Sequence, residues 1–423
     1  MARETRSRAD GQVTQVDSSP GSPSPAGLAV TPAFVLLFSI RLKGAVKGLG
    51  PLPPGIAPLS PEATQAYTTG LAEFERRLLG KTFLEARRIT RWPLGRIALT
   101  DLPEGAPAHA DVYLLSHKSG VALWEVWLPA PDQPFDAARW IGWLDSETED
   151  GLVARLWHVL GPINHGIAGK TTWSGLYFPL TILRAPHHAL DTIVERHGPD
   201  IVRLLFLDHS DRPLKPELVS EELARDYCAR QGGMTLLARR SGLDLHDREE
   251  AAENTQATGL PPRSALPFLV TLELLLLEHA VLQHLYDRLS RHMPRSVEEL
   301  IALKQEVIDG LEEYYGAITT ATRFSDAVTA DGERLLGVED IYDAVVERME
   351  AVSFAITTRS QRQMTLLQFW LTIVFGASEI GFIAASIATW YYRTGLGVVL
   401  AWTIGAALVF GVGLAALLRG KVE

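Results

Sequence analysis

Two long apolar runs dominate the C-terminal end of the chain. They extend from Phe369 to Tyr391 and from Leu396 to Leu418. Each meets the requirement of about 20 mostly apolar residues for a helix that crosses a membrane. Because only the short stretch "YRTG" connects them, they predict an antiparallel transmembrane hairpin.

The segment before the first run predicts an unusually long helix. No Pro or Gly occurs between Val338 and Phe375, so one helix can continue from Val338 to Tyr391, a length of roughly 80 Å. Helical patterns also cover residues 268–292 and 297–322. The first of these is apolar but contains Glu273 and Glu278, so we expect a buried helix of a soluble region rather than a membrane span.

The first half of the chain has a mixed pattern. "AFVLLFSIRL" predicts a first β-strand, and "ADVYLLSHKSGVALWEVWLPAP" predicts a hairpin. "IVRLLFLD" (Ile201 to Asp208) indicates another buried strand, whereas "FDAARWIGWLD" and "HHALDTIVERHG" have helical spacing. The predicted fold is therefore an α/β cytoplasmic domain followed by long stalk helices and a C-terminal two-helix transmembrane hairpin.

These patterns divide the chain into four parts. The N-terminal residues are rich in Ser, Pro and Gly and indicate a disordered tail. The predicted parts are the tail (1–30), the α/β domain (31–265), the helical stalk region (266–363) and the transmembrane domain (364–423).

The net charge and the cysteine content indicate which partners and which cellular compartment suit this protein. The 423 residues have a formal net charge of −10, which argues against a nucleic-acid partner because such a partner requires clustered Lys and Arg. Cys228 is the only cysteine, so no disulfide can form within the chain, as suits the cytoplasm. The lipid bilayer is the expected partner instead.

The basic residues around the two runs predict their orientation. Arg359 and Arg362 precede the first run, and Arg419 and Lys421 follow the second, whereas Arg393 alone lies between them. Since loops rich in Lys and Arg stay in the cytoplasm, the sequence predicts a multi-pass protein of the cell (inner) membrane with both termini cytoplasmic.

Most polar residues in and just before the first run lie on one side of the predicted helix, with Ser378 and Thr389 as exceptions whose hydroxyls can bond to their own helix backbone. At about 100° per residue, the residues on this side fall within roughly 40° of Glu379. A carboxylate inside a membrane usually faces a bundle interior or a water-filled cavity. The second run offers only Thr403 and Trp402 as polar side chains, so the stripe predicts a homo-oligomer. The predicted ion pathway consists of Thr365, Gln368, Thr372, Glu379, Ser386 and Arg393. A structural polar seam between subunits is the alternative.

Acidic residues continue along a similar line toward the N-terminal end of the long helix. In an oligomer they could form rings that concentrate cations. Alternatively, they are the solvated face of an amphipathic stalk. The residues concerned are Glu339, Asp343, Glu347 and Glu350.

The combined architecture resembles the CorA-like family of divalent-cation channels and transporters. The similarity is greatest from "LEEYYGAITTATRFSDAV" through "LAALLRGKVE". It implies metal ion transport by a homopentamer, with the first span lining the pore and a divalent cation as substrate or regulator. The family's Gly-Met-Asn motif is absent, because the corresponding stretch is "ATWYYRTGLG". The resemblance therefore extends to architecture and not to magnesium selectivity.

Other motifs do not point to catalysis. "NHGIAGKTT" has Asn164 where a phosphate-binding loop needs Gly. His279 and His284 are five residues apart, which does not suit a zinc site. No cofactor is identified, and we expect a protein that is not an enzyme. The sequence favours a homo-oligomeric ion channel or transporter that its cytoplasmic domain gates. The alternative is a membrane-anchored, ligand-sensing effector that does not transport metal selectively.

Overall fold

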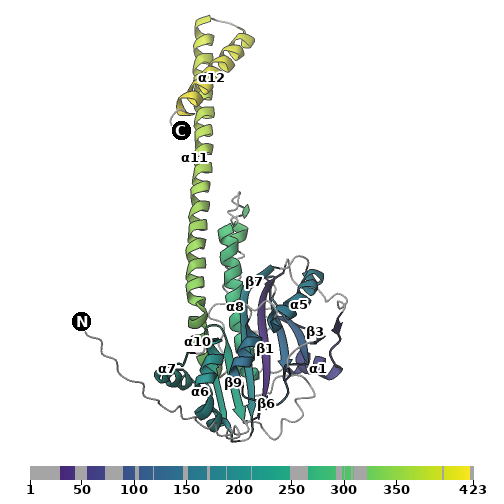
Figure 1. Cartoon of the computed structure of the whole chain (residues 1–423). Helices are drawn as coiled ribbons and strands as arrows, with labels where there is room; N and C mark the ends of the chain where they lie inside the picture. Colours follow the sequence, from purple (N-terminus) through teal and green to yellow (C-terminus); the bar gives the residue numbers. More distant parts are fainter. Residues whose placement is uncertain are drawn as a thin grey trace, which may run out of the picture. The chain divides into compact units, whose positions relative to one another are not determined.

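The computed structural model divides the chain into two compact units (Figure 1). Unit 1 comprises Met1–Ala280 and Tyr314–Val338, and unit 2 comprises Val281–Glu313 and Glu339–Glu423. The structure describes residues 29–42, 55–71, 89–100, 104–117, 119–145, 151–168, 172–186, 188–210, 212–247, 265–291, 298–299, 301–305, 308, 322–392 and 395–419. Residues 1–28 of the predicted tail and Arg393 lie outside these ranges, and β1 begins at Ala29.

A nine-stranded sheet forms the centre of unit 1, as far as the structure describes it. Its order is β2-β3-β4-β5-β1-β7-β9-β8, and β6 pairs with β1. Neighbouring strands are antiparallel except β7 and β9, which are parallel. The strands are β1 (Ala29–Arg41), β2 (Ile56–Ala57), β3 (Thr90–Ala98), β4 (His109–Ser116), β5 (Val121–Pro129), β6 (Gln133–Pro134), β7 (Thr172–Ala185), β8 (Gly233–Leu237) and β9 (Gly242–Asp247).

The predicted hairpin is confirmed as β4 and β5. Ser116 lies opposite Ala122, and Asp111 lies opposite Trp127. Gly120 in the turn has a φ of 83°, a left-handed conformation that glycine adopts without steric cost.

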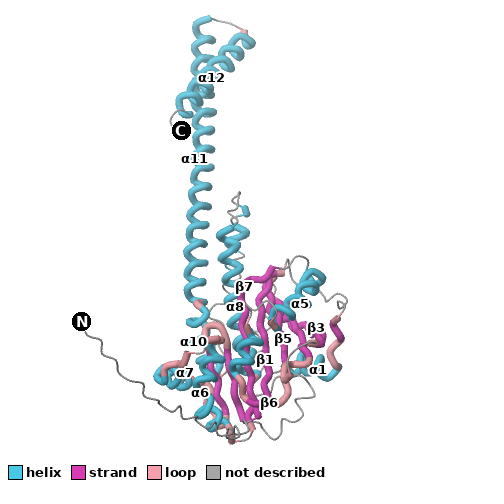
Figure 2. Tube along the Cα trace, viewed as in Figure 1, coloured by secondary structure: helices cyan, strands magenta, loops and turns pink. Residues whose placement is uncertain are grey.

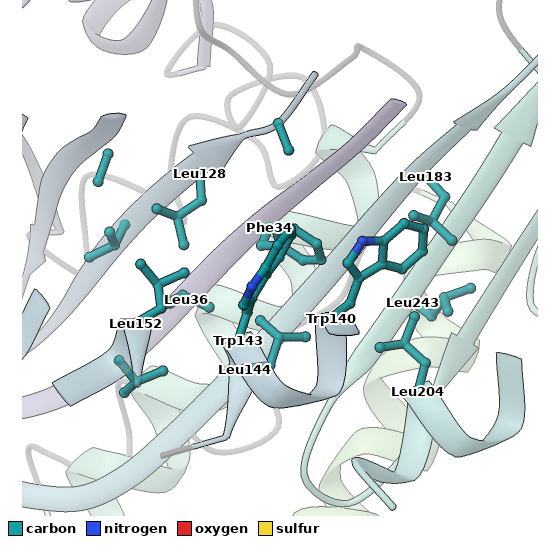
Figure 3. Packing of buried hydrophobic residues seen from close by; sticks show 14 of the residues in the cluster. Phe34, Leu36, Leu128, Trp140, Trp143, Leu144, Leu152, Leu183, Leu204 and Leu243 are labelled. Carbon is teal, nitrogen blue, oxygen red and sulfur yellow. The ribbon is translucent and has the colours of Figure 1, made fainter. Parts of the chain in front are cut away.

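One face of the sheet carries the main apolar core. Phe34, Leu36 and Phe38 of β1 point to this face, because side chains alternate along a strand. The cluster also includes residues of α4 (Ala137–Leu144), α5 (Leu152–Ala168) and α6 (Leu190–Phe206). The Phe34 ring meets Trp140 and Trp143 of α4 edge-on, with ring centroids 6.1 and 6.0 Å apart (Figure 3). We call this face the α4 face.

The opposite face of the sheet, which we call the α8 face, is covered by α8 (Leu266–Arg291). A Cβ added to Gly242 of β9 would lie 3.0 Å from Cζ of Phe268, so the helix approaches this strand closely. The most apolar 18-residue window of α8 is 83% buried. The prediction of a buried helix is therefore confirmed.

Two predictions about unit 1 need correction. Ile201–Asp208 is not a strand, because α6 continues through Pro199 to Phe206 after a kink at His197. Ile201, Val202, Leu204 and Leu205 are buried, and this spacing matches one side of a helix, whereas a short apolar run alone resembles a buried strand.

α10 (Arg323–Leu336) was not predicted from the sequence. Thr322 caps its start by accepting a hydrogen bond from the backbone N–H of Ser325, at 3.2 Å. Gly337 ends the helix with a φ of 68°. Both residues are ordinary helix-boundary signals. The other helices that the structure describes in unit 1 are short: α1 (Pro61–Gln65), the π-helix η1 (Ala66–Leu71) and α7 (Pro216–Ala224).

Unit 2 contains two apolar helices near the C-terminus. α11 (Val338–Tyr392) has 55 residues without interruption, as predicted (Figure 2). α12 (Leu396–Arg419) has 24 residues. Of the helix predicted over 297–322, the structure describes 298–299, 301–305 and 308 as helical, and the rest lies outside the described residues, apart from Thr322, which caps α10.

Candidate functional site

The predicted polar stripe lies along one side of α11. Thr365, Gln368, Thr372, Glu379 and Ser386 are all exposed in the single chain. Because α11 is a continuous helix, the other four side chains lie within roughly 40° of Glu379 around the helix axis. Arg393, the sixth predicted residue, lies outside the described residues.

The hydroxyl groups of the stripe are satisfied within the helix. Thr365 donates to the carbonyl of Gln361 at 2.8 Å, and Thr372 donates to that of Gln368 at 2.7 Å. Ser386 likewise donates to the carbonyl of Phe382 at 2.9 Å. A carboxylate cannot bind helix carbonyls in this way, because both groups are acceptors. Glu379 is therefore the residue of the stripe that most requires water, a cation or a donor from elsewhere.

α12 contacts a different face of α11. A Cβ added to Gly381 would lie 3.2 Å from the carbonyl oxygen of Thr403, and one added to Gly376 would lie 3.4 Å from the Phe410 ring. Ile373 on the same side is 5% exposed. This contact face is centred roughly 130° around the helix from Glu379, at 100° per residue. The helix packing thus leaves the polar stripe uncovered.

The apolar surface of α11 is also exposed in the single chain. Its most apolar 18-residue window is only 17% buried, and Trp370, Phe382 and Trp390 are 57%, 71% and 83% exposed. α8 and α11 are the two helices in the described residues that are long and apolar enough to cross a membrane. Of these two, α11 directs its apolar surface outward, whereas α8 is packed inside unit 1 over most of its length.

The acidic residues at the start of α11 all lie on its exposed side. Val345 and Val352, on the other side of the helix, are 0% and 4% exposed. Among the residues that the structure describes, no group of three or more His, Cys, Asp or Glu side chains is arranged to hold a metal ion. The four exposed acids are Glu339, Asp343, Glu347 and Glu350.

A buried ion cluster lies between the sheet and α8, and the sequence analysis did not identify it. Arg91 of β3 donates to Glu125 of β5 at 2.8 Å and to Glu273 of α8. The side chain of Arg91 is 6% exposed, and those of both glutamates are 0% exposed. We call these residues, together with Tyr67, the Arg91 cluster.

Aromatic rings surround the Arg91 cluster. Tyr67 of η1 donates to the same Glu125 oxygen at 2.9 Å, and its ring lies 5.5 Å from the Arg91 guanidinium. The Tyr67 ring also stacks on Tyr113, with centroids 3.9 Å apart. Burial, followed by the charge of Glu125, raises the pKa of Tyr67 well above its usual value. Tyr67 therefore remains a neutral donor that holds Glu125.

A second polar group lies on the same face of the sheet, at β7, β8 and β9. Asp244 accepts hydrogen bonds from Arg184 at 3.3 Å and from Thr235 at 3.0 Å, and His246 lies 2.9 Å from it. Burial alone would raise the pKa of Asp244. The hydrogen bond and charge of His246, together with Arg184 and Thr235, outweigh burial and hold the pKa below its usual value.

Cys228 lies near this group and is half-buried. A Cβ added to Gly233 would lie 2.7 Å from Sγ of Cys228 and 2.5 Å from the His246 ring. Burial raises the pKa of the Cys228 thiol. This shift disfavours the thiolate, which is the reactive form of cysteine.

The structure describes Asn164–Ala168 and Thr172 of the phosphate-loop candidate, and Gly169–Thr171 lie outside the described residues. A phosphate-binding loop leads from a strand into a helix, whereas Asn164–Thr172 leads from the end of α5 into β7. His279 is largely buried, and burial lowers its pKa.

The Arg91 cluster is difficult to predict from the sequence because its residues are far apart along the chain. Arg91 is 34 residues from Glu125 and 182 residues from Glu273. The only local indications are one Glu within the apolar strand "VALWEVWLP" and one within the apolar start of α8. Neither glutamate indicates which basic side chain it contacts in the folded protein.

The sequence matches no protein-family model and no curated protein.

Proposed function

We propose that this protein is a homo-oligomeric membrane ion channel or transporter in which α11 lines the ion path and unit 1 regulates it. The observation that carries the proposal is the polar stripe of α11, which is exposed on a face that α12 does not contact. A path along this stripe would pass Thr365, Gln368, Thr372, Glu379 and Ser386.

The cost of placing Glu379 in lipid supports an oligomer. A carboxylate in the centre of a membrane is expensive unless it faces water, a cation or another polar group. α12 meets α11 through Gly376 and Gly381 on another side, so it does not cover Glu379. Copies of α11 around a common axis would place the stripe toward water and the exposed apolar residues toward lipid.

In this proposal, α11 and α12 cross the cell membrane as an antiparallel hairpin. Trp370 and Trp390 are exposed and 20 positions apart on α11, a separation of about 30 Å that matches the hydrocarbon thickness. Arg359 and Arg362 before the span, with Arg419 and Lys421 after α12, favour cytoplasmic termini.

Ion flux into proteoliposomes that contain the full chain tests the ion path. We expect Glu379→Ala to reduce cation flux strongly, because the substitution removes the only carboxylate from the stripe. Ser378→Ala is the matched control, since Ser378 is adjacent, lies about 100° off the stripe and donates to its own helix at Phe375. Equal flux through both variants would contradict the proposed path.

The oligomeric state in lipid nanodiscs tests the assembly separately. Light scattering or native mass spectrometry should give a ring-forming number of subunits. A strictly monomeric or dimeric protein would contradict any pore lined by several copies of α11, whether or not unit 1 regulates it.

A second candidate is a membrane-anchored effector that senses a ligand without selective metal transport. The stretch "ATWYYRTGLG" favours it, because the Gly-Met-Asn motif is missing and Arg393 stands at the expected outer mouth. A cation there would oppose the entry of a divalent cation. Liposomes that leak only after a small molecule is added, with no discrimination between ions, would support this candidate over the first.

A further inference from the structure

The first half of α8 is mostly apolar, although it also contains the buried Thr271, Glu273 and Glu278. Leu272, Leu274, Leu275, Leu276 and Leu277 are all 0–2% exposed, and these residues cover more than one full turn. Many leucine contacts of such a helix could be kept after a shift of one turn, about 5.4 Å. Apart from close approaches such as that of Leu275 to Gly332, apolar packing therefore discriminates less between axial positions than a buried charge pair does.

Arg91 adds a polar constraint on the axial position of α8. Its guanidinium is already held from the sheet side by Glu125 at 2.8 Å, and it lies over the Tyr67 ring. These contacts direct the other nitrogen, Nη2, toward α8, where it donates to Glu273. Both partners are almost fully buried, so a change of position would break a hydrogen-bonded charge pair away from water.

The observed axial position of α8 is the one that places Glu273 against Arg91. A shift by three or four residues in either direction would replace Glu273 with an apolar residue that cannot accept a hydrogen bond. The replacements are Leu269, Val270, Leu276 and Leu277. Buried polar groups are known to fix the register of otherwise apolar helices.

We propose that the ion pair between Arg91 and Glu273 is a register pin, which selects one axial position of α8 and whose release allows the helix to shift by one turn. One-turn shifts of packed helices are an established form of switching. α8 is a single helix that continues beyond Ala280 into unit 2, so an axial shift in unit 1 also displaces its C-terminal part. Arg91 is thus a positioning residue, and the inference does not depend on ion transport.

Cysteine cross-linking in the full chain tests the register directly. Gly332 of α10 contacts Leu275, because a Cβ at Gly332 would lie 2.5 Å from Cδ1 of that residue. In a Cys228→Ser background, Gly332→Cys is combined with Leu275→Cys to report the observed position. Combination with Thr271→Cys or with His279→Cys reports a shift of one turn. Peptide mass spectrometry after mild oxidation identifies each disulfide.

The pin is then removed with Glu273→Leu, which leaves Arg91 paired with Glu125. When the Arg91 cluster is unaltered, we expect a disulfide between positions 275 and 332 only. After Glu273→Leu, we also expect a disulfide between 271 and 332 or between 279 and 332. Persistence of the 275–332 product alone, in a variant that melts cooperatively, would overturn the proposal.

Two further variants distinguish an axial shift of α8 from a general loss of packing in unit 1. Arg184→Met with Asp244→Leu removes a buried ion pair from the same sheet face, and it should leave the 275–332 product alone. Arg91→Met with Glu125→Gln and Glu273→Leu removes all charges of the cluster and should give the shifted products. Loss of cooperative melting in both pin variants would also overturn the proposal, because the cluster would then hold the unit together rather than select a register.

Discussion

Gly332 of α10 lies directly against Leu275 of α8, since a Cβ added to Gly332 would lie 2.5 Å from Cδ1 of Leu275. Leu275 is fully buried, so its side chain has little room to move. We expect Gly332→Ala to lower the free energy of unfolding by about 1–3 kcal/mol, as overpacking a core usually does. Thermal melting of the full chain in detergent measures the change.

Gly142 of α4 provides the matched control. It also lies within a helix, but a Cβ there would meet nothing within 4 Å. Gly142→Ala should therefore be neutral or stabilising by up to about 1 kcal/mol, because alanine loses less backbone freedom on folding. If Gly332→Ala melts at or above the temperature of Gly142→Ala, the close approach of α10 and α8 is wrong.

Arg91→Met should be among the most destabilising single substitutions in unit 1. It removes the guanidinium that Glu125 and Glu273 share while both carboxylates remain buried. Breaking a buried ion pair in this way typically costs about 3–5 kcal/mol. Denaturant unfolding measures the loss.

Arg334→Met is the exposed counterpart of Arg91→Met. The Arg334 side chain is 75% exposed and pairs with Asp331 one turn away at 2.8 Å. Exposed pairs contribute only about 0–1 kcal/mol. Similar losses from the two substitutions would mean that Arg91 is not buried against its partners in solution.

The fold was predictable where the pattern is local, and the Arg91 cluster was not. The β4–β5 hairpin, α4 and the uninterrupted α11 follow from alternation, helical spacing and the lack of Pro and Gly. Ile201–Asp208 was wrong because a short apolar run is compatible with either a strand or the buried side of a helix. Arg91 and Glu273 are brought together only by the sheet order and the path of α8, which no local pattern encodes.

The acid dependence of stability should include a contribution from Asp244. Its folded pKa lies below the usual 3.8, so the unfolded chain takes up a proton first as the pH falls. The stabilisation is therefore complete above the unfolded pKa and is lost as the pH falls through the folded pKa. Urea unfolding across the acid range should show the difference between the native chain and Asp244→Asn shrinking below about pH 3.8.

Asp226 should behave in the opposite way. Burial raises its pKa, although the backbone N–H groups of Thr235 and Cys228 partly offset the effect. The folded state then binds the proton more tightly, so protonation of Asp226 adds stability as the pH falls through its folded pKa. The same sign of pH dependence in Asp244→Asn and Asp226→Asn would contradict the two opposite environments.

Gly381 should be essential for the contact between α11 and α12. An added Cβ would lie 3.1 Å from Cγ2 of Thr403 and 3.2 Å from its carbonyl oxygen. Since a backbone carbonyl cannot rotate away, Gly381→Val should separate the helices and lower stability by about 1–3 kcal/mol. Thermal melting in detergent or nanodiscs measures the loss.

Two companion variants identify which atom of Thr403 limits the approach to Gly381. Thr403→Ala removes Cγ2 but leaves the carbonyl, so it should rescue Gly381→Val only in part. Gly405→Ala is the control on α12, because a Cβ at Gly405 would meet nothing within 4 Å. Full rescue by Thr403→Ala would show that the methyl group alone limits the approach. An equal loss in Gly405→Ala would show that α12 meets α11 through a different face.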